Sequence, residues 1–159
     1  MALAIIMVWY AGLGALAATG AMYVSHTFVP AKHEATLYGL VFIAIAAVYL
    51  AFNSYFGNAA AWRLETIAVL AFAVMGCVGT RVPAVLIAGY ALHGGWDLLH
   101  EAQAHMQVDV FGGREATKIP LAYGAFCATF DWVIPVYFGY RRRAWAAARK
   151  SRRADAELS

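Results

Sequence analysis

The sequence predicts an all-α membrane protein, a polytopic bundle of about five transmembrane helices, on three observations. Hydrophobic residues make up 63% of the 159 residues, whereas soluble domains contain about 45–50%. Charged residues make up only 13%, and a soluble domain of this length has too little interior to bury so much apolar surface. Long runs without charge recur along the chain, each close to the length of about 20 residues that crosses a bilayer.

Turn residues and charges separate the expected spans. Pro30 and Pro83 suit the first turn of a helix, and a polar stretch that contains Gly112 and Gly113 is typical of an external loop. The five spans are expected near residues 2–25, 35–52, 62–80, 82–101 and 119–140. Residues 1–143 then form the transmembrane domain, and residues 144–159 form a basic tail.

The distribution of basic residues predicts the orientation. Seven of the 12 Lys and Arg residues lie between Arg141 and Arg153, so the positive-inside rule places the C-terminus in the cytoplasm and the N-terminus outside. This orientation places three other basic residues on the outer side, which the rule disfavours, but the seven in the tail outnumber them. The tail is expected to contact anionic membrane lipids, and no nucleic-acid partner is expected. The N-terminal run lacks the basic segment of a cleaved signal peptide, so it is interpreted as the first span.

Three polar side chains share one face of the fourth expected span. At 100° per residue, His93, Asp97 and His100 fall within an arc of about 60°. The fifth span adds Asp131, and Pro135 four residues later cannot donate a hydrogen bond to the carbonyl of Asp131. Because charges inside a span are costly, each of them calls for an explanation.

The predicted orientation brings these groups together near the outer side of the membrane. The predicted cluster contains His93, Asp97, His100 and Asp131, with three rim residues in addition: Asn53, Glu65 and Glu101. Imidazole and carboxylate groups are suitable ligands for a divalent metal such as zinc. In a hydrolytic reaction on a lipid-like substrate, the metal or Asp97 would activate water and a histidine would accept the proton.

Other interpretations of the same residues stay open at this stage. The cluster could relay protons in a proton-coupled transporter or sensor, or it could be a hydrogen-bonded network that only fixes helix packing. The chain could also be an accessory subunit of a larger membrane complex, or form a homo-oligomer. The two cysteines, Cys77 and Cys127, are far apart in sequence and predict no metal site. Glu34, with its neighbouring histidines, is expected to lie at the membrane interface as a solvated or capping group.

The last two spans carry a pattern that resembles a known family. Its parts are His93-x-x-Trp96-Asp97-x-x-His100, then Pro120, then Phe126-Cys127-x-x-x-Asp131. The pattern is similar to that of a family of small bacterial integral membrane proteins of unknown function, in which a histidine stands where this chain has Glu101. The resemblance implies a location in the bacterial cytoplasmic membrane and brings no activity with it.

Overall fold

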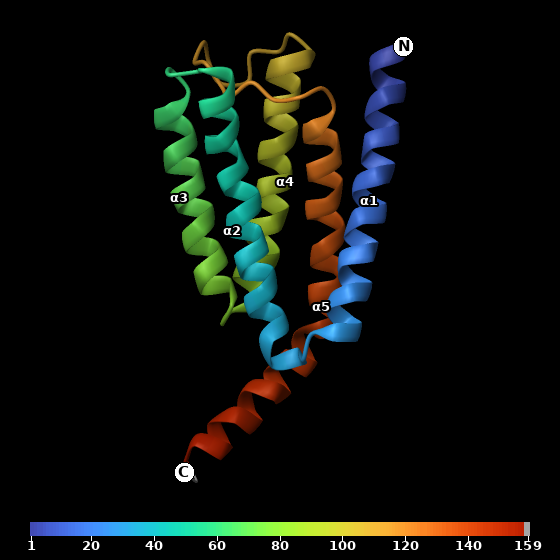
Figure 1. Cartoon of the computed structure of the whole chain (residues 1–159), viewed down its shortest axis with the longest axis vertical. Coiled ribbons are helices and arrows are strands. Elements are labelled where there is room, and N and C mark those ends of the chain that lie inside the picture. Colours follow the sequence, from blue (N-terminus) through green and yellow to red (C-terminus); the bar gives the residue numbers. More distant parts are fainter. Residues whose placement is uncertain (158–159) are drawn as a thin grey trace.

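The protein folds into five α-helices joined by short turns and one longer loop (Figure 1). The structure is a computed structural model that describes residues 1–157, with side chains described as far as residue 151. Within these residues the fold is all-α and contains no strand. The helices are α1 (Ala2–Phe28), α2 (Ala31–Phe56), α3 (Trp62–Gly79), α4 (Pro83–His105) and α5 (Tyr123–Glu157).

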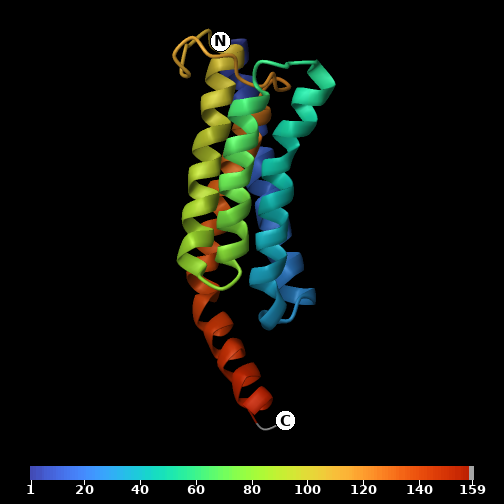
Figure 2. The same cartoon turned by 90° about the vertical axis from the view of Figure 1, so that its left-hand side faces the viewer.

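The helices run side by side along the long axis of the molecule, and consecutive helices are antiparallel (Figures 1 and 2). Helix α5 lies between α4 and α1 and makes the most extensive contacts with both. Helix α2 packs mainly on α3, and α3 packs on α4. The centre of the bundle is therefore enclosed by α2, α3, α4 and α5, while α1 lies at the side of α5.

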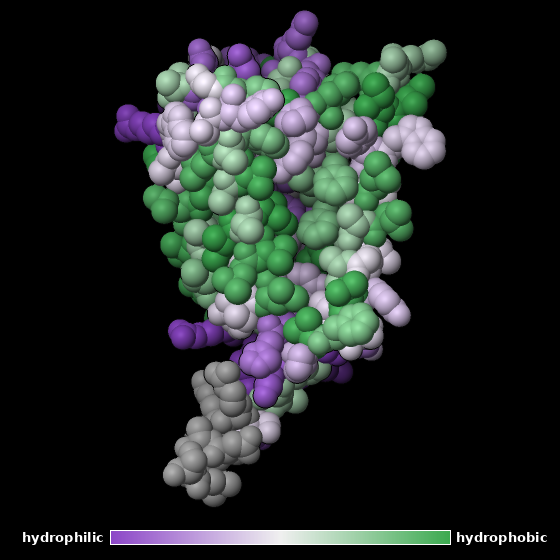
Figure 3. Space-filling model, in the orientation of Figure 1, coloured by the Kyte–Doolittle hydropathy of each residue, from purple (hydrophilic) through white to green (hydrophobic). Residues whose placement is uncertain are grey.

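Three of the helices, α1, α2 and α3, are long and apolar enough to cross a membrane. Large apolar side chains point away from the bundle; on α1, for example, Trp9 is 71% exposed and Leu16 is 68% exposed. On the face drawn in Figure 3, hydrophobic residues cover most of the middle of the molecule, and hydrophilic residues gather toward its two ends. These are the features of a membrane protein. Helices α4 and α5 are less apolar, α4 because it carries several histidines and acids and α5 because it carries Asp131 and a basic C-terminal part.

Several helix ends differ from the sequence prediction. Helix α2 continues beyond residue 52, where the second span was expected to end, to Phe56, and Gly57 caps it with a left-handed φ of 64°. Helix α4 extends to His105, four residues beyond the expected end. Helix α5 begins only at Tyr123, because Ala122 adopts a φ of 61°.

At its other end α5 does not stop at residue 140, where the fifth span was expected to end, but continues as a helix through Arg141 to Glu157, so most of the expected tail is helical. Residues 158 and 159 of that tail lie outside the described residues. Arg, Ala and Lys, which have high helix propensity, dominate this extension. In Figure 1 the extension projects beyond the bundle at the end opposite the N-terminus.

Close backbone contacts hold α5 against its two neighbours. A Cβ at Gly14 of α1 would meet the backbone carbonyl of Phe126. A Cβ at Gly124 of α5 would meet the carbonyl of Asp97 and the side chain of Glu101. Glycine therefore lets α5 approach α1 on one side and α4 on the other, which places Asp131 opposite the polar stripe of α4.

Candidate functional site

His93, Asp97 and Asp131 form a buried group at the contact between α4 and α5. The Nδ1 atom of His93 lies 2.7 Å from Oδ2 of Asp131 and 3.2 Å from Oδ2 of Asp97. When Asp131 is ionised, its oxygen can only accept, so Nδ1 of His93 carries the proton of this hydrogen bond. All three side chains are 1% exposed or less. Asp97 lies four residues after His93 on α4, so both project from one face of the helix toward α5.

Tyr49 of α2 completes this group, and sequence reasoning missed it. Its hydroxyl donates a hydrogen bond of 2.6 Å to Oδ1 of Asp97. Tyr49 belongs to a stripe of buried residues on α2 that recur every three or four positions and face the centre of the bundle. The stripe consists of Tyr38, Phe42, Ala46, Tyr49 and Asn53. This spacing is visible in the sequence and could have placed Tyr49 in the bundle interior.

Aromatic rings surround the imidazole of His93. The ring centroid of Phe72 lies 4.8 Å from that of His93, and the centroid of Phe42 lies at 5.7 Å, both nearly perpendicular to it. The opposite nitrogen of the imidazole, Nε2, has no hydrogen-bond partner in the described part of the chain. The same holds for Oδ2 of Asp97 and Oδ1 of Asp131. The site therefore combines polar atoms that lack a hydrogen-bond partner among the described residues with apolar, aromatic surroundings.

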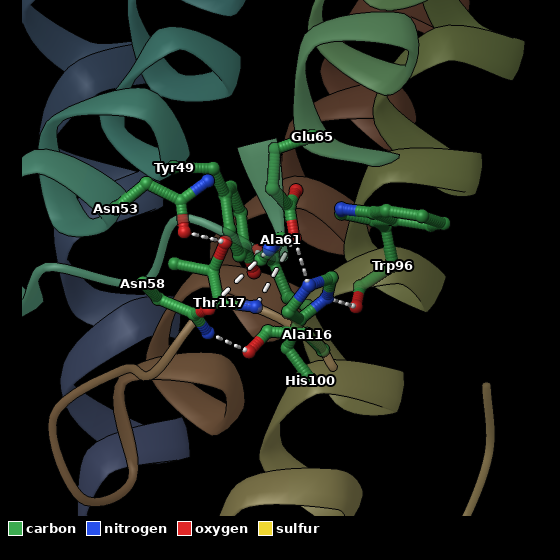
Figure 4. A network of polar contacts seen from close by, with 10 residues as sticks. Tyr49, Asn53, Asn58, Ala61, Glu65, Trp96, His100, Ala116 and Thr117 are labelled. Carbon is green, nitrogen blue, oxygen red and sulfur yellow. Dashed lines mark hydrogen bonds and ion pairs between the residues drawn. The ribbon is translucent and has the colours of Figure 1, made fainter. Parts of the chain in front are cut away.

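His100 lies outside this group, although the sequence predicted it as a fourth member. Its Nε2 atom lies 2.7 Å from Oε1 of Glu65 on α3, and its Nδ1 atom donates to the backbone carbonyl of Trp96 at 3.0 Å (Figure 4). The backbone N–H of Thr117 also donates to Glu65, at 3.3 Å. Glu65, a predicted rim residue, is thus the partner of His100 in a second buried group, which we call the upper pair.

The loop after α4 closes over the upper pair. The hydroxyl of Thr117 donates to the side-chain carbonyl of Asn53 at 2.8 Å, and the side chain of Asn58 donates to the backbone carbonyl of Ala116 at 2.8 Å (Figure 4). Thr117 is buried, so this part of the predicted external loop is packed into the bundle. Asn53 was predicted at the rim of the site, and it lies beside the upper pair.

Glu101 has a structural contact in place of the predicted solvated or rim position. Its two carboxylate oxygens accept hydrogen bonds of 2.9 Å from the backbone N–H groups of Ala122 and Gly124. Ala122 directly precedes α5 and Gly124 lies in its first turn, where backbone N–H groups have no partners within the helix. A carboxylate there is also stabilised by the helix dipole. Glu101 therefore fixes where α5 begins.

Glu34 is likewise buried rather than solvated at the interface. Its Oε2 atom accepts from Nε of Arg141 at 2.9 Å and from the indole of Trp145 at 2.8 Å, and its Oε1 atom accepts from the hydroxyl of Tyr137. The guanidinium of Arg141 makes a second contact of 2.8 Å with the same oxygen. Glu34 thus ties the first turn of α2 to the extension of α5.

The buried acids differ in how their charge is balanced. Among the described side chains the buried acids are Glu34, Glu65, Asp97, Glu101 and Asp131. Arg141 balances Glu34, the start of α5 balances Glu101, and the upper pair contains one histidine for one carboxylate. Asp97 and Asp131 share a single histidine. With both carboxylates ionised, even a protonated imidazole leaves this group with one net negative charge, which is costly in a low-dielectric interior unless a further proton or a cation balances it.

The group has the ligand atoms for a small cation. One nitrogen of His93 and one oxygen from each aspartate lie within 4.8 Å of one another. Bonds of about 2.0–2.2 Å connect a tetrahedral zinc to nitrogen and carboxylate oxygen, which places the ligand atoms about 3.4 Å from one another. Only small shifts of the three side chains are therefore needed, including a slight opening of the 2.7 Å contact between His93 and Asp131. The hydrogen bond from Tyr49 to the other oxygen of Asp97 orients that carboxylate, as outer partners do in metal sites.

Comparison of the chain with models of known protein families, with curated protein sequences and with solved structures finds no match. The assignment of a function therefore rests on the geometry and the charge of the buried group.

Proposed function

We propose that the chain is an integral membrane protein that binds a divalent metal ion, such as zinc, at His93, Asp97 and Asp131. The observation that carries the proposal is that two fully buried carboxylates share one imidazole. Each other buried acid of the described chain has a compensating partner, whereas two carboxylates here share one imidazole. Two carboxylates, a neutral imidazole and one divalent ion add up to no net charge, which suits a site inside a bilayer.

Metal binding would replace the proton on His93. The Nδ1 atom is protonated while it donates to Asp131, and a metal ligand must be deprotonated. The ion would bind Nδ1 of His93 and Oδ2 of each aspartate, and Tyr49 would keep its hydrogen bond to Asp97. Three protein ligands leave a fourth position for water, as in catalytic zinc sites. Because all three side chains are enclosed, the geometry supports cation binding more directly than hydrolysis of a lipid-like substrate.

For the topology we propose five spans, with the N-terminus outside and the C-terminus in the cytoplasm. The basic extension of α5 lies at the same end of the bundle as Lys32 and Arg81, which supports this orientation under the positive-inside rule. The metal group then lies in the outer half of the membrane, because Asp97 is about 12 Å along α4 from the outer end at His105. The bacterial cytoplasmic membrane is the location that the family resemblance implies.

Metal analysis of the purified full-length protein tests the proposal with a matched pair of variants. The wild type, purified without chelators and incubated with zinc, should contain about one zinc per chain by mass spectrometry. His93→Gln should lose the metal, whereas His100→Gln should retain it. The two variants are matched, because each removes a buried histidine that lies beside a carboxylate, but only His93 lies beside two carboxylates. Absence of metal from the wild type, or equal loss from both variants, would contradict the proposal.

A second candidate function is proton binding or relay along the bundle. The ring of Tyr49 lies between the two histidines, with centroid distances of 6.0 Å to His93 and 4.6 Å to His100. The polar groups therefore form a nearly continuous column from the metal group to the loop. One additional proton would neutralise the group as well as a metal does. Proton flux in proteoliposomes that depends on Asp131 but not on zinc would favour this candidate.

A further inference from the structure

Basic side chains gather at the opposite end of the bundle, where the extension of α5 leaves it. A pocket of about 210 Å³ is lined by Lys32 from the first turn of α2, Arg81 from the turn between α3 and α4, and Arg149 from α5. Thr36, Thr80 and Ala148 complete the lining. Three separate segments therefore each contribute one cation to the same small space.

The three cations have no acidic partner in the described part of the chain. Of the lining residues none is acidic, and the ion pairs found among the described side chains include none of the three. Arg141, two helical turns before Arg149 on α5, is by contrast paired with Glu34. Like charges gathered in one pocket repel each other, and an anion bound between them would relieve this repulsion.

The position of Arg149 is built into the fold. Glu34 holds Arg141 and Trp145, and Trp145 is 1% exposed with its ring centroid 5.4 Å from that of Phe138. These contacts dock the start of the extension on the bundle. Arg149 follows one helical turn after Trp145 and is half-buried against the ends of α2 and α3. The pocket is thus a consequence of packing rather than of a freely moving tail.

We propose that this pocket binds a phosphate group, supplied in the membrane by the headgroup of an anionic phospholipid. Basic pockets between helices at the cytoplasmic side are suited to such headgroups, and guanidinium groups bind phosphate through charge-assisted hydrogen bonds. Lys32 and Arg81 lie at helix ends, at the depth where headgroups would be found in the proposed topology. The site is separate from the metal group and does not depend on it.

Native mass spectrometry of the full-length protein in detergent tests the proposal with two variants of equal charge. One combines Lys32→Gln, Arg81→Gln and Arg149→Gln. The control combines three substitutions at exposed basic residues of the extension that do not line the pocket: Arg142→Gln, Arg143→Gln and Lys150→Gln. Each is titrated with dioleoylphosphatidylglycerol, with dioleoylphosphatidylcholine and with inorganic phosphate.

We expect phosphatidylglycerol to bind the wild type and the control with similar affinity. The pocket variant should bind it about tenfold more weakly or worse, since each basic residue near the headgroups contributes substantially to the attraction. Phosphatidylcholine should bind weakly to all three. Equal weakening in both variants, or none in either, would overturn the pocket site. Tight binding of inorganic phosphate that depends on the three residues, without selective binding of phosphatidylglycerol, would overturn the lipid assignment and leave a soluble anion as the ligand.

Both variants must remain helical and monodisperse for this comparison. Their six residues are half-buried or exposed, so the fold should tolerate the substitutions. Arg81→Gln alone, in the turn between α3 and α4, provides a milder second variant. It should weaken phosphatidylglycerol binding severalfold, and an unchanged affinity would count against the pocket.

Discussion

Substitution of Tyr49 by phenylalanine removes a single hydroxyl from the candidate metal site. This hydroxyl donates a 2.6 Å hydrogen bond to a carboxylate oxygen of Asp97 that is fully buried. Hydrogen bonds to charged groups contribute about 1.5–3 kcal/mol to stability. The ring itself stays in place, so its packing on His100 at 4.6 Å is retained. Loss of an outer partner of a metal ligand lowers metal affinity by about 10–100-fold, and we expect that range for Tyr49→Phe.

The assay is competition for zinc against a chromophoric chelator, with thermal unfolding in the same detergent. Tyr90→Phe is the matched control, because Tyr90 is also fully buried but donates to the backbone carbonyl of Tyr38, at 3.0 Å. It should lose about 0.5–1.5 kcal/mol of stability while its zinc affinity changes less than about twofold. A Tyr49→Phe protein with wild-type zinc affinity, or a Tyr90→Phe protein with an equal loss of affinity, would refute the reasoning.

Three further predictions concern the contacts that position the site. Gly14→Ala should reduce stability by about 1–3 kcal/mol, because it overpacks the contact of α1 with α5. Gly12→Ala is the control and should leave stability unchanged, because a Cβ at Gly12 has nothing within 4 Å. Thermal unfolding compares the two variants, and equal losses of stability would argue against the close contact. Glu101→Gln should reduce stability by about 1–3 kcal/mol, because two amides at the start of α5 lose a charged acceptor. Unfolding in a denaturing detergent measures this loss, and wild-type stability would show that the capping contact is unimportant. Glu34→Gln should release the extension of α5, which hydrogen exchange would detect as faster exchange after residue 140 with α4 unchanged; unaltered exchange there would contradict the anchoring role.

The presence of helices and the polar stripe of α4 could be predicted because both depend on local periodicity. Long uncharged runs predict helices, and a spacing of four residues puts His93 and Asp97 on one face. The proximity of Asp131 to this face of α4 was predicted from the topology, because adjacent antiparallel helices place residues of equal membrane depth side by side. The docking of the α5 extension on α2 could not be predicted in this way, because it depends on tertiary contacts of Arg141 and Trp145 with Glu34.

The partner of His100 depended on tertiary packing that the sequence does not reveal. His93 and His100 share one face of α4, but they lie at different depths. At the level of His93 the facing helix is α5, which supplies Asp131. At the level of His100 the backbone of α5 is only beginning, at the amides held by Glu101, and α3 supplies Glu65 instead. Depth along the helix, more than angular position, therefore decides which histidine joins the metal group.

The contribution of the loop after α4 was also beyond the sequence. A polar stretch with two adjacent glycines predicts an external loop, and Gly112 and Gly113 do adopt positive φ. Nothing in that pattern indicates that Thr117 is buried and bonded to Asn53 and Glu65. Such contacts depend on the path of an irregular segment, which has no periodicity from which to predict it.

The central claim is that one divalent ion is held inside the bundle by one histidine and two aspartates. X-ray absorption at the zinc K-edge of the zinc-loaded protein tests it most directly. The account predicts one imidazole nitrogen and oxygen ligands at about 2.0–2.2 Å, with the imidazole contribution lost in His93→Gln. A shell that contains sulfur, or two imidazoles, or that is unchanged in His93→Gln, would contradict it.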